Sequence, residues 1–206
     1  MPSTLRCWVR VAGVVLAWAL AGPGHAAGDA QRGKQIGYTC LGCHGIENYK
    51  NVYPTYSVPK LVGQNPAYLV AALKSYRGKQ RSHGTMYAQA SSLSDQDMED
   101  VAAYLSQQPL PKTATAVGSA PTKVTSLCAA CHGANGVGIM AEYPTLAGQH
   151  SDYLMRALIE YQKGDRKNLI MQSFVTQLSA ADIKSIAEYY AAQRPALQTV
   201  LRRNWL

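Results

Sequence analysis

The sequence has little charge and almost no phenylalanine. Charged residues make up 16% of its 206 positions, below the usual quarter, and a single Phe stands beside 13 Tyr. After residue 26, no stretch approaches the roughly 20 apolar residues that a membrane-spanning helix needs. The sequence therefore predicts a soluble mature chain, and its apolar content of 47% excludes wholesale disorder.

The amino-terminal region has the pattern of a targeting segment. Two arginines precede an apolar run at 11–20, and a Gly-Pro breaker and a small-x-small site at 24–26 follow it. This order is typical of a cleaved secretory signal peptide, so residues 1–26 are predicted to direct export to the periplasm. Cys7 would be removed with the signal peptide, which leaves four cysteines in the mature chain.

The four remaining cysteines lie in two copies of one motif, C-x-x-C-H. This is the attachment sequence of c-type haem: two thiols one helical turn apart add to the vinyl groups of the porphyrin, and the adjacent imidazole ligates the iron. The copies are Cys40, Cys43 and His44, and Cys128, Cys131 and His132. Two covalently attached haem c groups are therefore predicted.

Other uses of paired cysteines fit less well. A four-cysteine zinc site usually separates its two pairs by about 15–20 residues, whereas Cys40 and Cys128 are 88 positions apart. A thioredoxin-like pair requires a neighbouring βαβ pattern, and the flanks of both motifs are helical in pattern. A disulfide within C-x-x-C would be strained and would leave both histidines without a role.

The two motifs mark a duplication that runs through the mature chain. A Pro-x-Leu-x-Gly-Gln segment occurs at 59–64 and again at 144–149, and Met86 and Met171 each lie seven residues before a Leu-Ser pair. All these pairs are offset by 85 positions, which indicates two homologous modules in tandem. The predicted division is an N-terminal domain at 27–106, a linker at 107–121 and a C-terminal domain at 122–206.

Each module has the pattern of a small helical bundle. One helix is expected between residues 66 and 78, with its counterpart between 151 and 164. A capping box is expected to open the last helix of each module, with Ser94 and Asp97 forming the first of the two. The sequence has no convincing alternating strand pattern, so the predicted fold class is all-α.

The order of these features resembles the class I cytochrome c fold, and two such modules in one exported chain resemble the dihaem cytochromes c of the cytochrome c4 family. The resemblance covers essentially the whole mature chain. It implies that a motif histidine and a loop methionine ligate each iron, and that a proline carbonyl accepts the Nδ1 hydrogen of that histidine. The residues so implied are His44, Met86 and Pro59 in the first domain, and His132, Met171 and Pro144 in the second.

Comparison of the two modules supports the choice of methionines. A methionine is by default a filler of gaps in the core, but only Met86 and Met171 coincide across the repeat. His83 lies in the same loop as Met86 and is the rival ligand; its counterpart is Asn168. Methionine with histidine raises the reduction potential, as an electron carrier requires.

Four repeated tyrosines have two interpretations. A ring with a polar tip suits a crevice where hydroxyl groups meet haem propionates, and it suits half-buried helix packing equally well. The candidates are Tyr68, Tyr76, Tyr153 and Tyr161.

The ligand set predicts an electron carrier and not an enzyme. Six-coordinate irons leave no position for a substrate, and the sequence has no nucleophile or paired carboxylates arranged for catalysis. The resemblance implies a respiratory role between a quinol-oxidising cytochrome bc complex and a terminal haem-copper oxidase. Two alternatives stay open: the dihaem subunit of a periplasmic dehydrogenase such as a flavocytochrome, and a small haem peroxidase or ligand sensor.

The net charge of +8 gives little support to nucleic-acid binding, or to more than peripheral membrane association. The mature chain has 18 basic and 12 acidic residues, and two propionates on each haem would cancel most of this excess. Basic residues cluster at 74–81 and again at 163–167. Such clusters are usually solvated, and they could also steer a monomeric chain onto an acidic redox partner.

Overall fold

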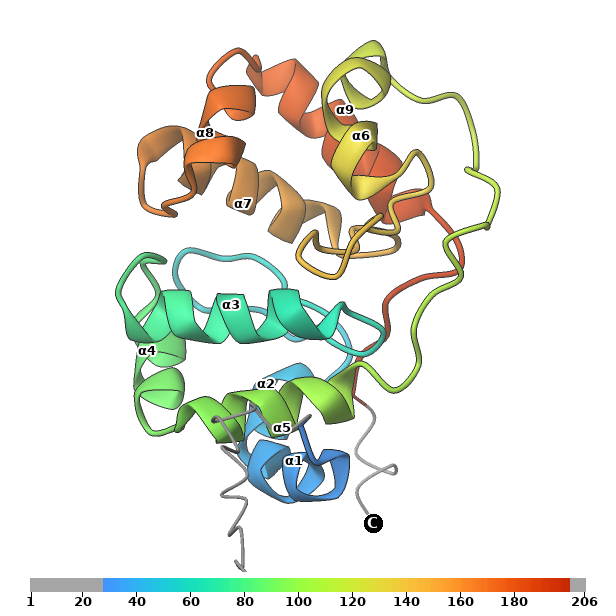
Figure 1. Cartoon of the computed structure of the whole chain (residues 1–206). Coiled ribbons are helices and arrows are strands. Elements are labelled where there is room, and N and C mark those ends of the chain that lie inside the picture. Colours follow the sequence, from blue (N-terminus) through green and yellow to red (C-terminus); the bar gives the residue numbers. More distant parts are fainter. Residues whose placement is uncertain (1–27, 201–206) are drawn as a thin grey trace, which may run out of the picture.

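The computed structural model describes residues 28–200, and this part of the chain is helical. Its β-type pairings are three isolated bridges, so the all-α prediction is confirmed for these residues. The helices form two lobes stacked on each other, joined at one side by an extended segment (Figure 1). Within the described range, no helix is long and apolar enough to cross a membrane. The predicted signal peptide lies outside that range.

The first lobe contains a broken amino-terminal helix and three longer helices. Its elements are α1 (Ala30–Ile36), a 3-10 turn (Gly37–Cys40), α2 (Leu41–His44), α3 (Pro66–Arg77), α4 (Gly84–Ser91) and α5 (Asp95–Leu105). The first C-x-x-C-H motif spans the 3-10 turn and α2, so its two thiols and its imidazole project from about one helical turn.

The second lobe repeats this order. Its elements are a π-helical turn (Val124–Cys128), α6 (Ala129–His132), α7 (Ser151–Lys163), α8 (Leu169–Val175) and α9 (Ala180–Ala192). Helices α7, α8 and α9 each begin 85 residues after α3, α4 and α5. The repeat in the sequence is therefore a repeat of three-dimensional elements.

Local sequence signals explain where these helices begin. Helix α3 opens with Asn65 as its N-cap and Pro66 at its first position, where a missing N–H costs nothing. Ser94 and Asp97 form the expected capping box at the start of α5, and the same reciprocal contacts open α9. Ser151 is the first residue of α7 rather than its cap, because His150 holds the extended N-cap conformation.

Each lobe has its own hydrophobic core. In the first lobe α1 crosses α5 so closely that a Cβ on Gly33 would collide with the carbonyl oxygen of Asp100. The buried side chains of this core include Leu69, Met98 and Val101. The second core is built on the equivalent helices, and its buried residues are Val124, Leu154, Tyr161, Val175, Leu178, Ile183, Ile186, Ala187, Tyr189 and Tyr190.

The chain returns to the first lobe after α9 (Figure 1). Val62 and Gln198 exchange two backbone hydrogen bonds of 3.0 Å, and the N–H of Val200 donates to the carbonyl of His44 at 3.2 Å. The Val200 side chain is buried in the first core. This crossing is not evident from the sequence, because the tail has no counterpart in the first module.

The two lobes meet through hydrogen bonds that obey an approximate twofold symmetry. The Gln64 amide bonds the carbonyl and the N–H of Thr145 at 2.9 and 2.8 Å, and the Gln149 amide bonds the same two groups of Lys60 at 2.9 Å each. The repeat relates Gln64 to Gln149 and Lys60 to Thr145, so each lobe offers the same patch to the other.

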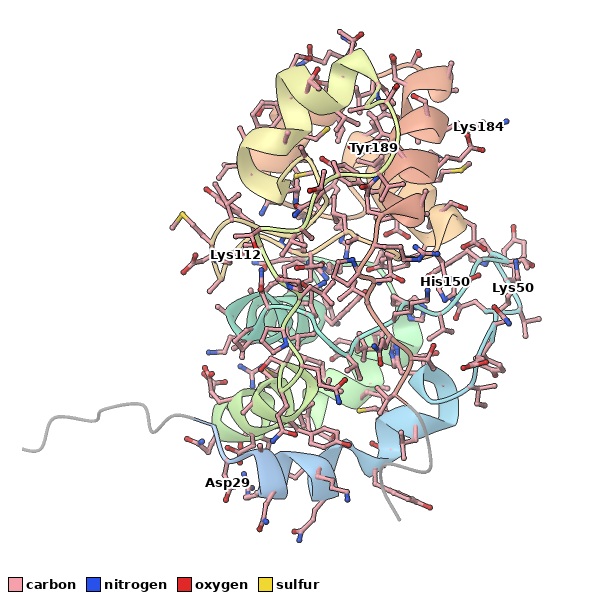
Figure 2. All side chains as sticks on the ribbon, turned by 90° about the vertical axis from the view of Figure 1, so that its right-hand side faces the viewer. Asp29, Lys50, Lys112, His150, Lys184 and Tyr189 are labelled. Carbon is pink, nitrogen blue, oxygen red and sulfur yellow. The ribbon has the colours of Figure 1, made fainter. Side chains whose placement is uncertain are left out.

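Helices α3 and α7 lie along the facing sides of the two lobes (Figure 1). Figure 2 shows Lys112 of the connecting segment on one side of the junction, with Lys50 and His150 on the other. The Lys112 ammonium donates to the carbonyl of Ile139 at 2.9 Å, so the connection is held against the second lobe.

Candidate functional site

The first motif places an oriented imidazole beside two thiols. His44 Nδ1 lies 2.8 Å from the carbonyl oxygen of Pro59. A carbonyl can only accept, so Nδ1 carries the proton and the lone pair of the neutral ring is on Nε2. Burial lowers the pKa of His44 more than the Pro59 contact raises it, which favours this neutral form. The imidazole is thus prepared to ligate a metal ion through Nε2.

These groups line a cavity of mainly apolar character in the first lobe. Cys40, Cys43 and His44 contribute from the motif, and Met86 contributes from α4. The apolar lining includes Ile36, Leu61, Leu69, Ala72, Leu73, Val101 and Leu105. Haem c is a large apolar ring that requires two thiols for attachment and two axial ligands for its iron. This cavity offers apolar walls, two thiols, an imidazole and a thioether, so its residues fit haem c.

His83 acts on the backbone of the helix that carries Met86. It is the N-cap of α4, and its Nδ1 accepts a hydrogen bond from the N–H of Met86 at 3.2 Å. In the second lobe, Asn168 caps α8 and its Oδ1 accepts from the N–H of Met171 at 2.9 Å. The rival candidate ligand therefore performs the same local task as its asparagine counterpart.

The second motif has matching geometry. His132 is buried, and its Nδ1 lies 2.9 Å from the carbonyl oxygen of Pro144. Burial lowers the pKa of His132 more than this contact raises it, so here too the neutral ring is favoured. Met171 and Cys128 both pack against the second core. Gly133 follows with a positive φ of 72°, a turn that a residue with a side chain would adopt only with strain.

No disulfide joins the cysteines of residues 28–200, so both pairs are available to attach a cofactor. Burial raises the pKa of the Cys40 thiol, and it raises that of Cys128 to about 11. The two pairs lie in different lobes, and no group of three His, Cys, Asp or Glu side chains between residues 28 and 200 is arranged to hold a bare metal ion. A four-cysteine zinc site is therefore inconsistent with the fold.

The basic clusters are not wholly on the surface. Arg81 and Arg166 were expected among exposed cations, but they are only 9% and 3% exposed and lie at the junction of the lobes. Packing of one lobe on the other buries them. The signal that identifies them is the repeat, since they are 85 positions apart and stand among four repeated tyrosines.

Known proteins share both halves of this architecture. Residues 30–109 match the family described as Cytochrome c, and residues 120–189 match the family described as Cytochrome C oxidase, cbb3-type, subunit III. Cytochrome c4 of Pseudomonas aeruginosa is 33% identical over 197 residues, covering 85% of this chain and 94% of the relative. The chain belongs to the cytochrome c4 family.

A solved structure and a further relative extend this result. The crystal structure of reduced recombinant cytochrome c4 from Pseudomonas stutzeri superposes with a TM-score of 0.65 at 30% identity, over 82% of this chain and 100% of the other. The thiosulfate dehydrogenase electron acceptor of Stutzerimonas stutzeri strain A1501 is 32% identical over 169 residues, covering 74% of this chain and 77% of the relative.

Membership of the cytochrome c4 family confirms the resemblance seen in the sequence. The chain is a dihaem cytochrome c with two class I cytochrome c modules, and its two Cys pairs attach two haem c groups covalently. It is an electron carrier.

Proposed function

We propose that this cytochrome c4 takes single electrons from a quinol-oxidising cytochrome bc complex and delivers them to a terminal haem-copper oxidase. In this proposal His44 and Met86 ligate the first iron, and His132 and Met171 ligate the second. When bound, each haem c supplies a one-electron Fe(II)/Fe(III) couple. The main support for the proposal is that Met86 and His44 line the same cavity, and that the Nδ1 atom of His44 donates a hydrogen bond to the carbonyl of Pro59.

The protein's own residues hold and insulate the two centres. The Pro59 and Pro144 carbonyls fix the rings of His44 and His132, a contact outside the ligand set that orients the ligating nitrogen. The apolar walls of the first cavity keep water away from its centre. In this proposal both ligand positions of each iron are taken, so the chain binds no substrate at its irons and acts as a carrier rather than an enzyme.

The proposal includes the organisation and location of the chain. Residues 1–26 serve as a cleaved signal peptide for export to the periplasm, 27–106 and 122–206 form the two domains, and 107–121 link them. The secretory pattern of the sequence supports export, and the absence of helix at 106–121 in the described structure supports the linker. We expect a monomer with no nucleic-acid partner and at most peripheral membrane association.

A redox titration followed by absorption spectroscopy tests the ligand assignment. The purified holoprotein should show two haems per chain, low-spin spectra and the sulfur-to-iron charge-transfer band of methionine ligation. Reduction of the protein by an isolated cytochrome bc complex with quinol, and its oxidation by a haem-copper oxidase, test the partners. Fast reduction coupled to negligible oxidation by the oxidase would contradict the proposed acceptor.

A second candidate places the protein downstream of a sulfur-compound dehydrogenase. The observation that favours it is the 32% identity with a thiosulfate dehydrogenase electron acceptor. Turnover of such a dehydrogenase with the protein as its only acceptor distinguishes this donor from the cytochrome bc complex. A peroxidase or ligand-sensor role would require one iron without its methionine, and rapid carbon monoxide binding by the reduced protein at neutral pH would reveal that.

A further inference from the structure

Two arginines are brought face to face where the lobes meet. Arg81 and Arg166 form an isolated antiparallel bridge between the loop after α3 and the loop after α7. On one side the N–H of Ser82 donates to the carbonyl of Asp165 at 2.9 Å, and on the other the N–H of Lys167 donates to that of Gln80 at 2.7 Å. The repeat exchanges these two bonds, so the twofold relation between the lobes passes through the arginine pair.

Phenol rings surround both guanidinium groups. Arg81 donates to the hydroxyl of Tyr68 at 3.4 Å, and Arg166 donates to that of Tyr153 at 3.2 Å. Arg81 also lies 5.4 Å from the ring centroid of Tyr76, and Arg166 lies 5.0 Å from that of Tyr161. The four tyrosines noted in the sequence therefore surround two cations, with two tyrosines of α3 beside Arg81 and two of α7 beside Arg166.

Neither arginine has a carboxylate partner among the ion pairs of residues 28–200. Their side chains are nevertheless almost completely buried. The Nε atom of Arg166 is buried without a hydrogen-bond acceptor among the described atoms. Two like charges placed together away from water are strongly unfavourable unless an anion joins them, so the pair has the properties of an anion site.

The pair is also next to the cofactor cavity. Arg81 lines the first cavity together with His44 and Met86, and Tyr153 of the second lobe reaches the same cavity. A planar guanidinium group can donate two parallel hydrogen bonds, one to each oxygen of a carboxylate. The anion that belongs in this cavity is a carboxylate side chain of haem.

We propose that Arg81 and Arg166 form one shared anion site, which holds a haem carboxylate from each lobe. The inference rests on the proposed haem sites and assigns two positioning residues to them. A positive charge near an iron stabilises its reduced state, because reduction adds one negative charge. Since the two guanidiniums share one junction, each raises the reduction potential of both haems, and that of its own lobe more strongly.

Neutral substitutions test the assignment in the holoprotein. Arg81→Gln should lower the equilibrium constant for reduction of the first haem by about tenfold, which is about 59 mV for one electron, and that of the second haem by less. Arg166→Gln should reverse this order. The control is Arg77→Gln, because Arg77 is half-buried at the end of α3 and pairs with Asp95. It should change neither constant by as much as twofold.

Charge-preserving substitutions separate position from charge. Arg81→Lys and Arg166→Lys should restore most of the potential lost in the glutamine variants, whereas a purely structural role would make lysine and glutamine behave alike. The proposal would be overturned if the glutamine variants changed the equilibrium constant for reduction of each haem by less than twofold. If Arg166→Gln fails to assemble as holoprotein, the less buried Arg81→Gln decides.

The unmodified holoprotein offers an independent measurement. Infrared redox difference spectra with isotope-labelled haem carboxyls should show ionised carboxylate at neutral pH in both oxidation states, and a protonated-carboxyl band from a junction carboxyl would overturn the proposal. Its failure is distinguishable from failure of the proposed function. If the arginine variants keep the original potentials and the methionine band is intact, only the proposed anion site is wrong. If the unmodified protein lacks the methionine band, the His/Met ligand assignment itself is wrong.

Discussion

The Nδ1 atom of His83 accepts a hydrogen bond of 3.2 Å from the backbone N–H of Met86. The same three-residue spacing joins Asn168 to Met171, at 2.9 Å. In both lobes a polar side chain at the helix N-cap thus fixes the first turn of the helix that carries the candidate ligand. The task of position 83 is to orient a short helix, which asparagine performs equally well.

Alanine at either methionine should remove one iron ligand and lower the potential of that lobe alone. Met86→Ala is expected to abolish about half of the sulfur-to-iron absorption band, because the second lobe retains its own thioether. Met171→Ala should abolish the other half. Absorption spectra and a redox titration measure both effects, and an unchanged band in Met86→Ala would show that the first iron has another ligand.

The matched control for this experiment is His83→Asn, which copies the second lobe into the first. Because asparagine can accept the same hydrogen bond from Met86, this variant should keep the full absorption band and a stable α4. Loss of half the band in His83→Asn would instead identify His83 as a ligand.

The parts of the molecule that local chemistry determines could be predicted from the sequence. The capping box of Ser94, the Asn65-Pro66 helix start and the C-x-x-C-H turns depend on residues within a few positions of each other. Because the repeated segments are 85 positions apart, the elements predicted for the first module also predict those of the second.

Features that depend on how one lobe packs on the other could not be predicted. Arg81 belongs to a run of cations in the sequence, but it is buried where its loop pairs with the Arg166 loop of the other lobe, and its guanidinium group lies over Tyr68 and Tyr76 of α3. The same reason applies to Val200, whose side chain completes a core formed by residues 41–105. Hydrophobic periodicity reports which face of a helix is buried, and it does not identify the surface that covers a loop.

The Gln64 amide should be among the strongest single contributions to the lobe junction. Gln64→Ala removes the partner of both the N–H and the carbonyl of buried Thr145, and each unsatisfied group costs about 1–3 kcal/mol. We expect the free energy of unfolding to fall by about 3 kcal/mol in urea denaturation. Gln35→Ala, at an exposed position of α1, should change it by less than about 0.5 kcal/mol. Equal effects of the two substitutions would show that the junction contributes little.

Gly33 permits the close crossing of α1 and α5. Gly33→Ala would drive a methyl group into the backbone of α5 at Asp100, and the helices would have to separate. We expect a loss of about 2–3 kcal/mol in unfolding free energy, seen as a lower transition temperature of the first lobe. Gly84→Ala is the control, because a Cβ there meets nothing within 4 Å. A Gly33→Ala protein as stable as the Gly84→Ala protein would exclude tight packing at this crossing.

The Asp152 carboxylate ties a loop of the first lobe to the start of α7. It accepts hydrogen bonds from the N–H and the hydroxyl of Ser57 at 3.0 and 2.9 Å and faces the Lys50 ammonium at 3.2 Å. Burial raises the pKa of Asp152, but these hydrogen bonds lower it by more, so the folded pKa lies below its usual value. A carboxyl of this kind stabilises the folded state above its unfolded pKa of about 3.9, and the contribution is lost as pH falls from there through the folded pKa.

The Asp152 contribution should therefore appear as a difference in acid sensitivity. The side chain is 36% exposed, so solvent screening limits its contribution to about 1 kcal/mol. Asp152→Asn should lower the unfolding free energy at pH 6 by that amount and reduce the further loss between pH 5 and pH 3, since no charge remains to be neutralised. Urea denaturation at the three pH values measures this, with Glu142→Gln at an exposed position as the control. If Asp152→Asn loses as much stability as the original protein between pH 5 and pH 3, this carboxylate is not the group that makes the lobe contact acid-sensitive.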